Sequence, residues 1–571
     1  MSNAHWLDLY SSNCYDWRSA RRSGRTSFYR PLGLVEFCFD ADGRYYEGRA
    51  DINMRLDLTL ESTLTRLERQ QHFTLAWTCL RARHIIAQAK APAWQDWMEK
   101  PPQITHEHCF LIDVPRDAAD AVQEAEKHIT FLETHHQEVD VEQFYVQAQN
   151  CARLLDPDQS LSRLLVLPPR GGSDGTESLT CIFIAAHQIG DGLSVGRWAS
   201  DFTRLLNMTE EALQVELREA IHPDAVKRIL PKAQESLYPQ VAGSRARQRW
   251  FWLLTRILRH VRKPLPAGFA NPLLRTTQHS VTVSPLWTDF LNYDRRPPTS
   301  AAPVGATMSA TATARMTKIC RSANVSVGAG CFALAAVLMM EFYERQQPDV
   351  PLEERKPFIT GFPLNPRPFL TGNPSIDSLM LAFSDGILLP FLPSSLDLAG
   401  RLRLLAKAAQ RQLAVYQKRS TVRTDKDGLQ YMSSRGAGRM LAIQYLSSFE
   451  RCELLLPIEK RKGSNPQGAY QMRPNMTRQT CGVSSTGRRA PLNEAVVSGN
   501  AEFLARAEDM APSVRPREGE FLVGIAGTDA GITCFISVDD TSMDPELVQA
   551  WLYRFRTILE EDNEARHAAK L

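Results

Sequence analysis

The residue string with the clearest chemical potential is His187-Gln188-Ile189-Gly190-Asp191-Gly192, an H-x-x-x-D-G pattern. Histidine is the side chain best suited to take up and return a proton near neutral pH, so His187 is a candidate general base. Asp191 follows after a turn and need not contact the histidine, and a role as a turn residue or helix N-cap is also open to it. Gly192 permits backbone angles that other residues resist. The surroundings of this string therefore decide whether it forms a site.

The segment before His187 predicts a strand, and the segment after Gly192 predicts a helix. Residues 177–186 read ESLTCIFIAA, rich in apolar and β-branched side chains, and the Gly-rich stretch 171–175 precedes them as a loop. After Gly192, apolar residues recur at helical spacing, at Leu193, Val195, Trp198, Phe202 and Leu206. A side chain just beyond the carboxyl end of a strand projects into the crevice where α/β sheets often hold ligands. His187 is thus expected where a base could meet a substrate.

The other predicted elements mix strands and helices in both halves of the chain. In the first half we expect a hairpin, with strands over 34–40 and 44–52 around a turn at 40–43, then helices over 58–84 and 118–131. In the second half we expect strands over 307–312, 358–364, 521–525 and 532–538. We expect helices over 314–322, 397–418, 429–447 and 545–561, and a long apolar helix that follows residue 322 and ends at 345. Residues 459–478 are expected to form a polar, mobile loop. Both halves are predicted to be α+β.

The length of 571 residues exceeds one ordinary domain. We expect an N-terminal domain over 1–230, a Pro-rich and basic connector over 231–303, and a C-terminal domain over 304–571. Within the connector, residues 245–263 read RARQRWFWLLTRILRHVRK, the pattern of a basic amphipathic helix. Such a helix can lie on a membrane surface. We expect instead that it packs its Trp, Leu and Ile side chains on the body of the protein.

Composition excludes several classes of function. Lys and Arg number 67 and Asp and Glu number 64, a net charge of +3, so no global charge attracts nucleic acid or an anionic membrane. The first residues lack the pattern of a secretory signal. The eleven cysteines are scattered without a C-x-x-C pair, and this pattern favours reduced thiols in a cytoplasmic protein. The histidines at 106–108 and 135–136 lack a third ligand at recognisable spacing, so we expect no metal site. The uncharged stretch 322–340 predicts a buried core helix rather than a membrane span, because it carries Asn324, Gly328 and Gly330, and we expect no stable membrane insertion.

Further motifs accompany the H-x-x-x-D-G string in an order that resembles the chloramphenicol-acetyltransferase-like superfamily of CoA-dependent acyltransferases. They are PLGLVEFCFD at 31–40 before a long helix, VSVGAGCFALAAVLMM at 325–340, FPLNPRPFLTGN at 362–373 and CGVSSTG at 481–487. The similarity covers most of the chain, and the fungal trichothecene O-acetyltransferases resemble it most among the subfamilies. The sequence also departs from relatives: residue 186 is Ala where condensation domains usually carry a second His, and no D-F-G-W-G occurs, which argues against the plant subfamily.

The resemblance implies a fold and an activity. The fold would be two such α+β domains, each a mixed sheet flanked by helices, with a tunnel at their interface that leads to His187 from both ends. The activity would be that of an acyl-CoA-dependent O-acyltransferase, which moves an acyl group, in the first instance acetyl, directly to a hydroxyl of a small secondary metabolite. Acyl-CoA would be a co-substrate, and no cofactor would be bound permanently. Because two fused halves would build the tunnel, we expect a monomer.

The resemblance also implies roles for single residues. His187 would be the general base. Asp191 would be structural, with its carboxylate turned away from the site and paired with an arginine, for which Arg367 in the N-P-R-P turn is the candidate. Ser484 and Ser485, next to Thr486, would donate hydrogen bonds to the oxyanion of the tetrahedral intermediate, although a plain Ser/Gly-rich turn is the alternative.

Two other functions stay open. One is acyl transfer from a donor that is bound to a carrier protein, as in condensation-type enzymes. The other is a catalytically inactive acyltransferase fold that serves as a binding protein, against which the retained His187 and Asp191-Gly192 argue.

Overall fold

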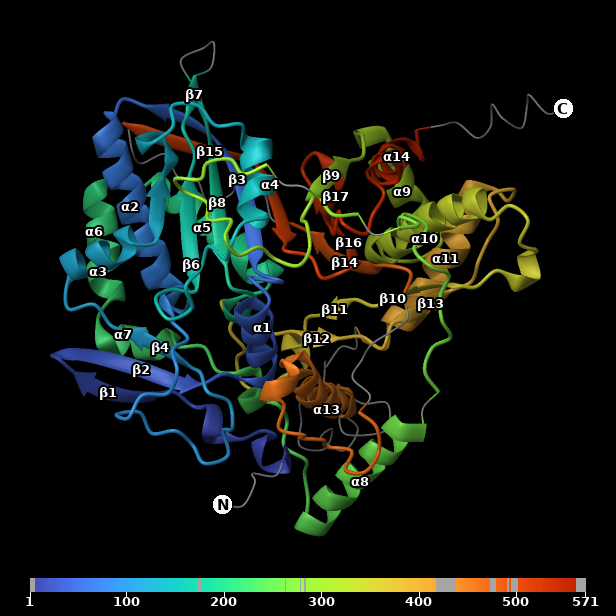
Figure 1. The fold of residues 1–571 in the computed structure, drawn as a ribbon, viewed down its shortest axis with the longest axis horizontal. Coiled ribbons are helices and arrows are strands. Elements are labelled where there is room, and N and C mark those ends of the chain that lie inside the picture. Colours follow the sequence, from blue (N-terminus) through green and yellow to red (C-terminus); the bar gives the residue numbers. More distant parts are fainter. Residues whose placement is uncertain are drawn as a thin grey trace.

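Two mixed β-sheets, each with helices packed against it, form the body of the protein (Figure 1). This computed structural model describes residues 6–171, 176–261, 263–277, 279–281, 284–416, 437–472, 479–489, 492–493 and 502–560. The predicted α+β class is confirmed.

The first sheet holds the strand that leads to His187. Its strands lie in the order β15 (Phe503–Val514), β3 (Ile52–Ser62), β8 (Glu177–Ala185), β6 (Ser162–Val166) and β5 (Ile129–Phe131), and β7 (Arg170–Gly171) pairs with β8. Neighbouring strands in this sheet run antiparallel, except that β6 and β5 are parallel. A smaller antiparallel sheet joins β1 (Arg18–Arg22), β2 (Arg25–Pro31) and β4 (Cys109–Asp113).

The second large sheet belongs to the C-terminal half. Its order is β14 (Gly482–Arg488), β16 (Phe521–Thr528), β17 (Gly531–Val538) and β9 (Val304–Thr307), with β14 and β16 parallel and the other pairs antiparallel. Two short antiparallel pairs lie apart from it: β10 (Phe358–Thr360) with β13 (Ile387–Leu389), and β11 (Pro363–Leu364) with β12 (Ala382–Phe383).

Helices cover the sheets and the connection between them. In the N-terminal half they are α1 (Leu34–Tyr45), α2 (Arg66–Arg83), α3 (Ala118–Glu126), α4 (Val141–Gln149), α5 (Gly192–Leu206), α6 (Glu210–Ala220) and α7 (Pro223–Ile229). Helix α8 (Arg245–Val261) lies in the connecting segment. The C-terminal half has α9 (Ala310–Ser322), α10 (Val327–Gln346), α11 (Leu398–Leu413), α13 (Ala437–Leu455) and α14 (Pro545–Thr557).

Strand β15 ties the two halves together. Although it lies late in the chain, it pairs with β3 along its length, from Phe503 opposite Ser62 to Val514 opposite Ile52. Four of its side chains belong to the hydrophobic core of the first sheet: Phe503, Ala505, Ala507 and Met510. The boundaries of the three predicted segments stay a prediction, but the C-terminal segment supplies an edge strand to the N-terminal sheet.

Helix α10 contains most of the long uncharged stretch. Among the described helices it is the one that is long and apolar enough to cross a membrane, and 78% of its most apolar window is buried inside the protein. Its side chains, from Ala329 to Phe342, lie in the core of the C-terminal half. The prediction of a buried core helix is confirmed, with the helix starting at Val327.

The predicted hairpin over 34–52 is wrong. Residues Leu34–Tyr45 form the helix α1, and β3 begins only at Ile52. The predicted turn at 40–43 depends on Asp40, Asp42 and Gly43. These two aspartates and Glu36 are instead buried and form ion pairs with arginines: Arg30 with Glu36, Arg44 with Asp40, and Arg49 and Arg517 with Asp42. Because these pairs hold charge inside the protein, sequence polarity does not mark the exposed face here.

Other predicted boundaries shift by a few residues. The helix predicted over 58–84 starts at Arg66, because residues up to Ser62 belong to β3, and the helix over 118–131 ends at Glu126 before β5. The strand predicted over 307–312 is β9, which ends at Thr307. The strands over 521–525 and 532–538 are confirmed as β16 and β17. The ends of the helices predicted over 397–418, 429–447 and 545–561, and of the loop over 459–478, fall partly outside the described residues.

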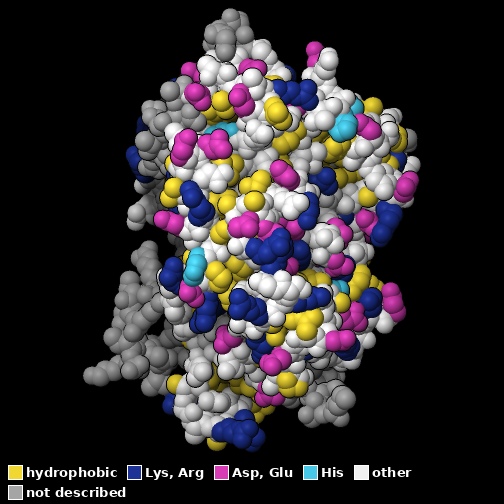
Figure 2. All heavy atoms as spheres, turned by 90° about the vertical axis from the view of Figure 1, so that its left-hand side faces the viewer, with side chains coloured by type: hydrophobic (Ala, Val, Ile, Leu, Met, Phe, Trp, Pro, Cys, Tyr) yellow, Lys and Arg dark blue, Asp and Glu magenta, His cyan; other side chains and the backbone are white. Residues whose placement is uncertain are grey.

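Charge is evenly distributed over the face shown in Figure 2, where acidic and basic side chains are interspersed, in keeping with the net charge of +3. All eleven cysteines are described, and each is a buried free thiol.

Candidate active site

The strand–turn–helix unit predicted around His187 is present. Strand β8 lies between β3 and β6 and ends at Ala185. A short 3-10 helix, η5 (His187–Ile189), follows, and α5 begins at Gly192. Since β8 is an interior strand, the residue after its carboxyl end is held on a rigid support deep in the protein.

His187 packs face to face against Phe39 of α1, with ring centroids 4.0 Å apart and planes 14° from parallel. The imidazole is surrounded by protein, yet its residue keeps part of its accessible surface. Burial lowers the pKa of His187; the Asp191 carboxylate acts against this shift and the Arg517 guanidinium adds to it. A lowered pKa keeps the ring neutral near neutral pH, which is the form that accepts a proton.

The two ring nitrogens of His187 differ in their surroundings. Nδ1 is buried, and within the described part of the chain no hydrogen-bond partner is aligned with it. The backbone of His187 and of Gly190 lies close enough to raise the pKa against the effect of burial. Nε2 is not among the buried, unpartnered side-chain atoms of the described residues.

Asp191 uses its two carboxylate oxygens differently. Oδ1 accepts hydrogen bonds from the backbone N–H groups of Leu193 and Ser194, both at 3.0 Å, and so caps the N-terminus of α5. Oδ2 lies 2.8 Å from Nη1 of Arg367. The N-cap role and the ion pair that the resemblance implies are thus both present, and the carboxylate makes no hydrogen bond with His187 in the described structure.

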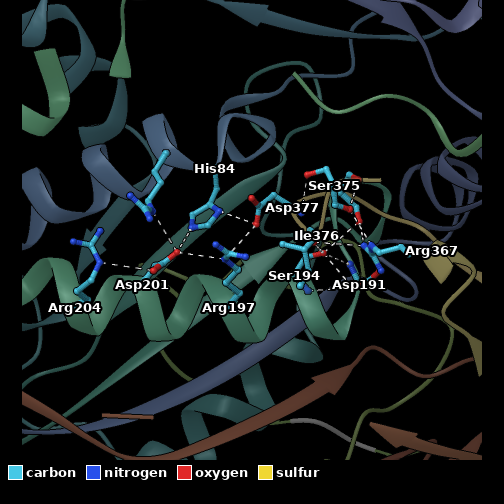
Figure 3. A network of polar contacts seen from close by, with 12 residues as sticks. His84, Asp191, Ser194, Arg197, Asp201, Arg204, Arg367, Ser375, Ile376 and Asp377 are labelled. Atoms are coloured by element: carbon cyan, nitrogen blue, oxygen red, sulfur yellow. Dashed lines mark hydrogen bonds and ion pairs between the residues drawn. The ribbon is translucent and has the colours of Figure 1, made fainter. Parts of the chain in front are cut away.

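Arg367 is held by a loop of the C-terminal half. It lies in η8 (Arg367–Phe369), where Nε donates to the carbonyl of Ser375 at 2.9 Å and Nη2 to that of Ser378 at 2.5 Å. Ser194 of α5 donates to the carbonyl of Ile376 at 2.8 Å. The start of α5 and the loop 375–378 therefore share a buried polar network, and this network fixes the segment that carries His187 (Figure 3).

A second charged group extends this network along α5 (Figure 3). His84, which directly follows α2, lies between two carboxylates: Nε2 is 2.9 Å from Oδ2 of Asp201 on α5, and Nδ1 is 3.0 Å from Oδ1 of Asp377 in the C-terminal loop. Burial alone lowers the pKa of His84, but the two carboxylates outweigh it and raise the pKa above its usual value. Arg83, Arg197 and Arg204 lie around the same carboxylates.

Gly192 does not have the role predicted from its backbone freedom. It is the first residue of α5 and is absent from the described residues with positive φ. It is exposed, and a Cβ added there would meet no atom within 4 Å. The reason for a glycine at this position is therefore not backbone strain or a close contact.

Ser484 and Ser485 lie on β14, an edge strand of the second sheet, and both are partly buried. No hydrogen bond or ion pair joins either of them to His187 among the described residues. Ser485 Oγ lies near the start of α10, 3.5 Å from where a Cβ on Gly328 would stand. Thr486 is exposed. Their role as oxyanion donors stays a prediction.

Sequence reasoning missed several residues of this site. Ser194 could have been found, because a serine three residues after Asp191 completes a capping box. Phe39 falls in the segment taken for a hairpin. His84 and Asp201 are separated by 117 residues, and no local pattern connects them.

Two surface cavities of about 550 and 750 Å³ adjoin α3, and neither is lined by His187. A tunnel to His187 stays a prediction. Within the described ranges, no group of three His, Cys, Asp or Glu side chains is placed to hold a metal ion.

Comparison with known proteins identifies the fold. No model of a protein family matches the sequence, and no curated protein matches it. Among solved structures, the chain is similar to the trichothecene 15-O-acetyltransferase of Fusarium sporotrichioides, with a TM-score of 0.62, 13% identity, and coverage of 95% of this chain and 97% of that chain.

Condensation domains match less closely. The starter condensation domain of rhizomide synthetase, in complex with C8-CoA, has a TM-score of 0.49 at 11% identity, and covers 92% of this chain and 93% of its own. The first condensation domain of the calcium-dependent antibiotic synthetase also has a TM-score of 0.49 at 11% identity, with coverage of 94% and 96%. The chain has the two-domain fold of CoA-dependent acyltransferases, and identities this low show the fold alone.

Proposed function

We propose that this protein is an acyl-CoA-dependent O-acyltransferase that transfers an acyl group, in the first instance acetyl, to a hydroxyl of a small secondary metabolite. The observation that carries the proposal is the position of His187. Within an acyltransferase fold, a neutral histidine follows the carboxyl end of an interior strand and is followed by Asp191, which is paired with Arg367.

The reaction would proceed by direct transfer. The acceptor hydroxyl gives its proton to Nε2 of His187 while its oxygen attacks the thioester carbonyl carbon of acyl-CoA. The tetrahedral intermediate collapses with cleavage of the carbon–sulfur bond, and the imidazolium returns the proton to the CoA thiolate. Proton transfer by a positioned base of this kind contributes about 10²–10⁴-fold to the rate.

The neighbouring residues would act on geometry and charge rather than on the substrate. Asp191 and Arg367 position the η5–α5 segment through contacts that turn away from the imidazole. The packing of Phe39 against the ring restricts its rotation and excludes water from one face. Ser484 and Ser485 are proposed to donate to the oxyanion, and the protein is proposed to act as a cytoplasmic monomer.

The experiment is to incubate the purified protein with acetyl-CoA and a panel of hydroxylated small molecules, following free CoA thiol and product mass. The proposal expects thiol release that depends on the acceptor, together with an ester product. Thiol release without an acceptor would show hydrolysis only. Transfer from an acyl-loaded carrier protein but not from acyl-CoA would favour the carrier-dependent alternative, and no transfer from either donor would favour a binding protein.

A further inference from the structure

Helix α8 presents an apolar stripe to solvent. Trp250, Leu253, Leu254, Ile257, Leu258 and Val261 recur at intervals of three and four residues, and so lie along one side of the helix. Each of them is 39 to 64% exposed. Exposed single apolar residues are ordinary on a protein surface, but six in one continuous stripe on one helix are not.

The side of α8 that faces the protein is a different one. The buried residues of the helix are Trp252, Thr255 and Arg259. Trp252 packs edge-on against Trp6, with centroids 5.3 Å apart, and Arg259 forms a buried ion pair with Glu450 of α13. At 100° per residue, Trp252, Thr255 and Arg259 lie on nearly the opposite side of the helix from Leu254, Ile257 and Val261.

This orientation reverses the usual arrangement of a surface helix. An amphipathic helix in a globular protein normally turns its apolar stripe to the core and its polar side to water. The expectation that this helix packs its Leu and Ile side chains on the body is therefore wrong, although Trp252 does pack there. Within the part of the chain that the structure describes, the apolar stripe stays exposed and open to a partner.

The charges around the stripe indicate the kind of partner. Residues 243–263 contain no Asp or Glu. Arg245, Arg247, Arg249 and Lys263 are all exposed. In a two-fold contact between copies of this chain across α8, the segment would meet a copy that carries the same cations and no acidic residue, which is unfavourable. Anionic lipid headgroups instead attract each such side chain, while the acyl boundary takes up the apolar stripe.

We propose that α8 docks this protein on anionic membrane surfaces, lying in the headgroup layer with the Trp250–Val261 stripe toward the acyl chains. The helix lies at the lower edge of the molecule in Figure 1, outside both large sheets, where a flat surface can approach it. Docking by one helix without a lipid anchor is reversible, so the protein would exchange between the surface and solution.

The test is sedimentation of the whole protein with vesicles of phosphatidylcholine alone and of mixed phosphatidylcholine and phosphatidylserine. We expect binding to the mixed vesicles, weaker binding as salt is raised, and little binding to phosphatidylcholine alone. Trp fluorescence should shift to the blue on binding as Trp250 leaves water. Binding that is equal on both vesicle types and insensitive to salt would overturn the electrostatic part of the proposal.

Variants assign the binding to α8. Trp250→Glu should weaken binding by at least about tenfold, because it puts a charge into the apolar stripe, and Arg249→Gln by about fivefold, since each basic side chain near an anionic surface contributes about 1 kcal/mol. The matched controls are Tyr553→Glu and Arg403→Gln, which change exposed residues on α14 and α11. Thermal melting of each variant establishes that it is folded.

Two outcomes would overturn the proposal. One is a folded Trp250→Glu variant that binds mixed vesicles as well as the unaltered protein. The other is a protein that fails to bind vesicles and is a dimer by light scattering, with Trp250→Glu converting it to a monomer; the stripe would then be a contact between copies. Neither result depends on acyl-transfer activity, so this test and that of the proposed function fail or succeed separately.

Discussion

Two histidines near the start and the middle of α5 have opposite electrostatic settings. His187 packs against an aromatic ring and near the Arg517 cation, and burial lowers its pKa. His84 lies between two carboxylates, which raise its pKa in spite of burial. The first setting favours the neutral form, which can act as a base, and the second favours the protonated form, so the same side chain is suited to proton transfer in one place and to holding structure in the other.

The pH dependence of kcat/KM should reflect the setting of His187. Protonated His187 cannot accept a proton, so kcat/KM should fall as the pH drops through the pKa of His187. Because this pKa is lowered, the acidic limb of the profile should lie below the ordinary histidine pKa of about 6.5. Arg517→Gln removes a charge that lowers this pKa, and should move the limb to higher pH. An acidic limb above the ordinary value, or one unmoved by Arg517→Gln, would contradict the assignment of His187.

The two roles of Asp191 can be separated by substitution. Asp191→Asn keeps a good N-cap but loses the ion pair with Arg367. Because the pair is buried, we expect the free energy of unfolding to fall by about 3 kcal/mol. Asp191→Ala loses the cap as well, and should cost about 1 kcal/mol more. Denaturant unfolding measures both values, and a melting curve of Asp191→Asn that matches the unaltered protein would remove the structural role.

At the scale of single residues, the sequence could identify His187, Asp191 and Arg367, because their motifs lie in recognisable local contexts. It could not identify His84 or Asp377, whose proximity arises only when the two halves pack together. The sequence also led to a wrong prediction of an unusual backbone angle at Gly192, since the angle at a glycine cannot be inferred from the residue type alone.

At the scale of elements, the end of α5 is attached to the C-terminal segment through Asn207. Its side-chain amide donates to the carbonyl of Ala505 and accepts from the N–H of Ala505, at 2.9 and 2.8 Å. Ala505 lies on β15, which is the edge strand of the first sheet. Asn493 makes the same pair of bonds, of the same lengths, to Ala507 two residues further along.

These two asparagines provide a matched comparison. Asn207→Ala should lower the free energy of unfolding by about 2–3 kcal/mol, because it leaves buried backbone groups of Ala505 without partners. Asn493 is exposed, so water can replace its amide, and Asn493→Ala should cost less than about 1 kcal/mol. If both substitutions lowered the free energy of unfolding equally, the burial of Asn207 would not be the reason for its contribution to stability.

Elements with clean periodicity could be predicted, and elements stabilised by distant partners could not. Strand β8 and helix α5 follow their apolar patterns, and are found where predicted. Helix α1 was mistaken for a strand because its buried acids are neutralised by arginines elsewhere in the chain. No prediction covers β15, whose buried side chains are of mixed type and whose partner β3 lies near the other end of the sequence.

At the scale of the whole molecule, His84 joins three segments that the chain brings together from both halves. Protonated, it pairs with Asp201 and Asp377 at once; neutral, it has one N–H for two carboxylates. Its contribution to stability is therefore fully present below the unfolded pKa of about 6.5, and is lost as pH rises through the raised folded pKa.

Substitution of His84 should accordingly have a pH-dependent cost. Below that pH we expect His84→Gln to be less stable than the unaltered protein by about 2 kcal/mol, and the difference should shrink as the pH is raised. His136→Gln is the control, because its partner Asp289 is half exposed. Unfolding measured across pH decides the matter, and a difference that does not vary with pH would refute a charged His84.

A series of packed helices connects α8, the proposed membrane helix, with the candidate active site. Helix α8 packs on α13, α13 packs on α1, and α1 carries the Phe39 that contacts His187. The two-domain acyltransferase fold could be inferred from the sequence because its motifs are distributed along the chain. The exposure of the apolar side of α8 could not be inferred from the sequence, since an amphipathic pattern does not say which side of a helix faces solvent.

The role of His187 as the base of an acyl transfer from CoA can be tested by one comparison of rates. The unaltered protein and His187→Ala are given acetyl-CoA and an accepted alcohol, and the rate of ester formation is measured by mass. We expect the rate to fall by about 10²–10⁴-fold in His187→Ala, with the melting temperature and the affinity for acetyl-CoA unchanged. A folded His187→Ala variant that forms ester at the original rate would contradict it.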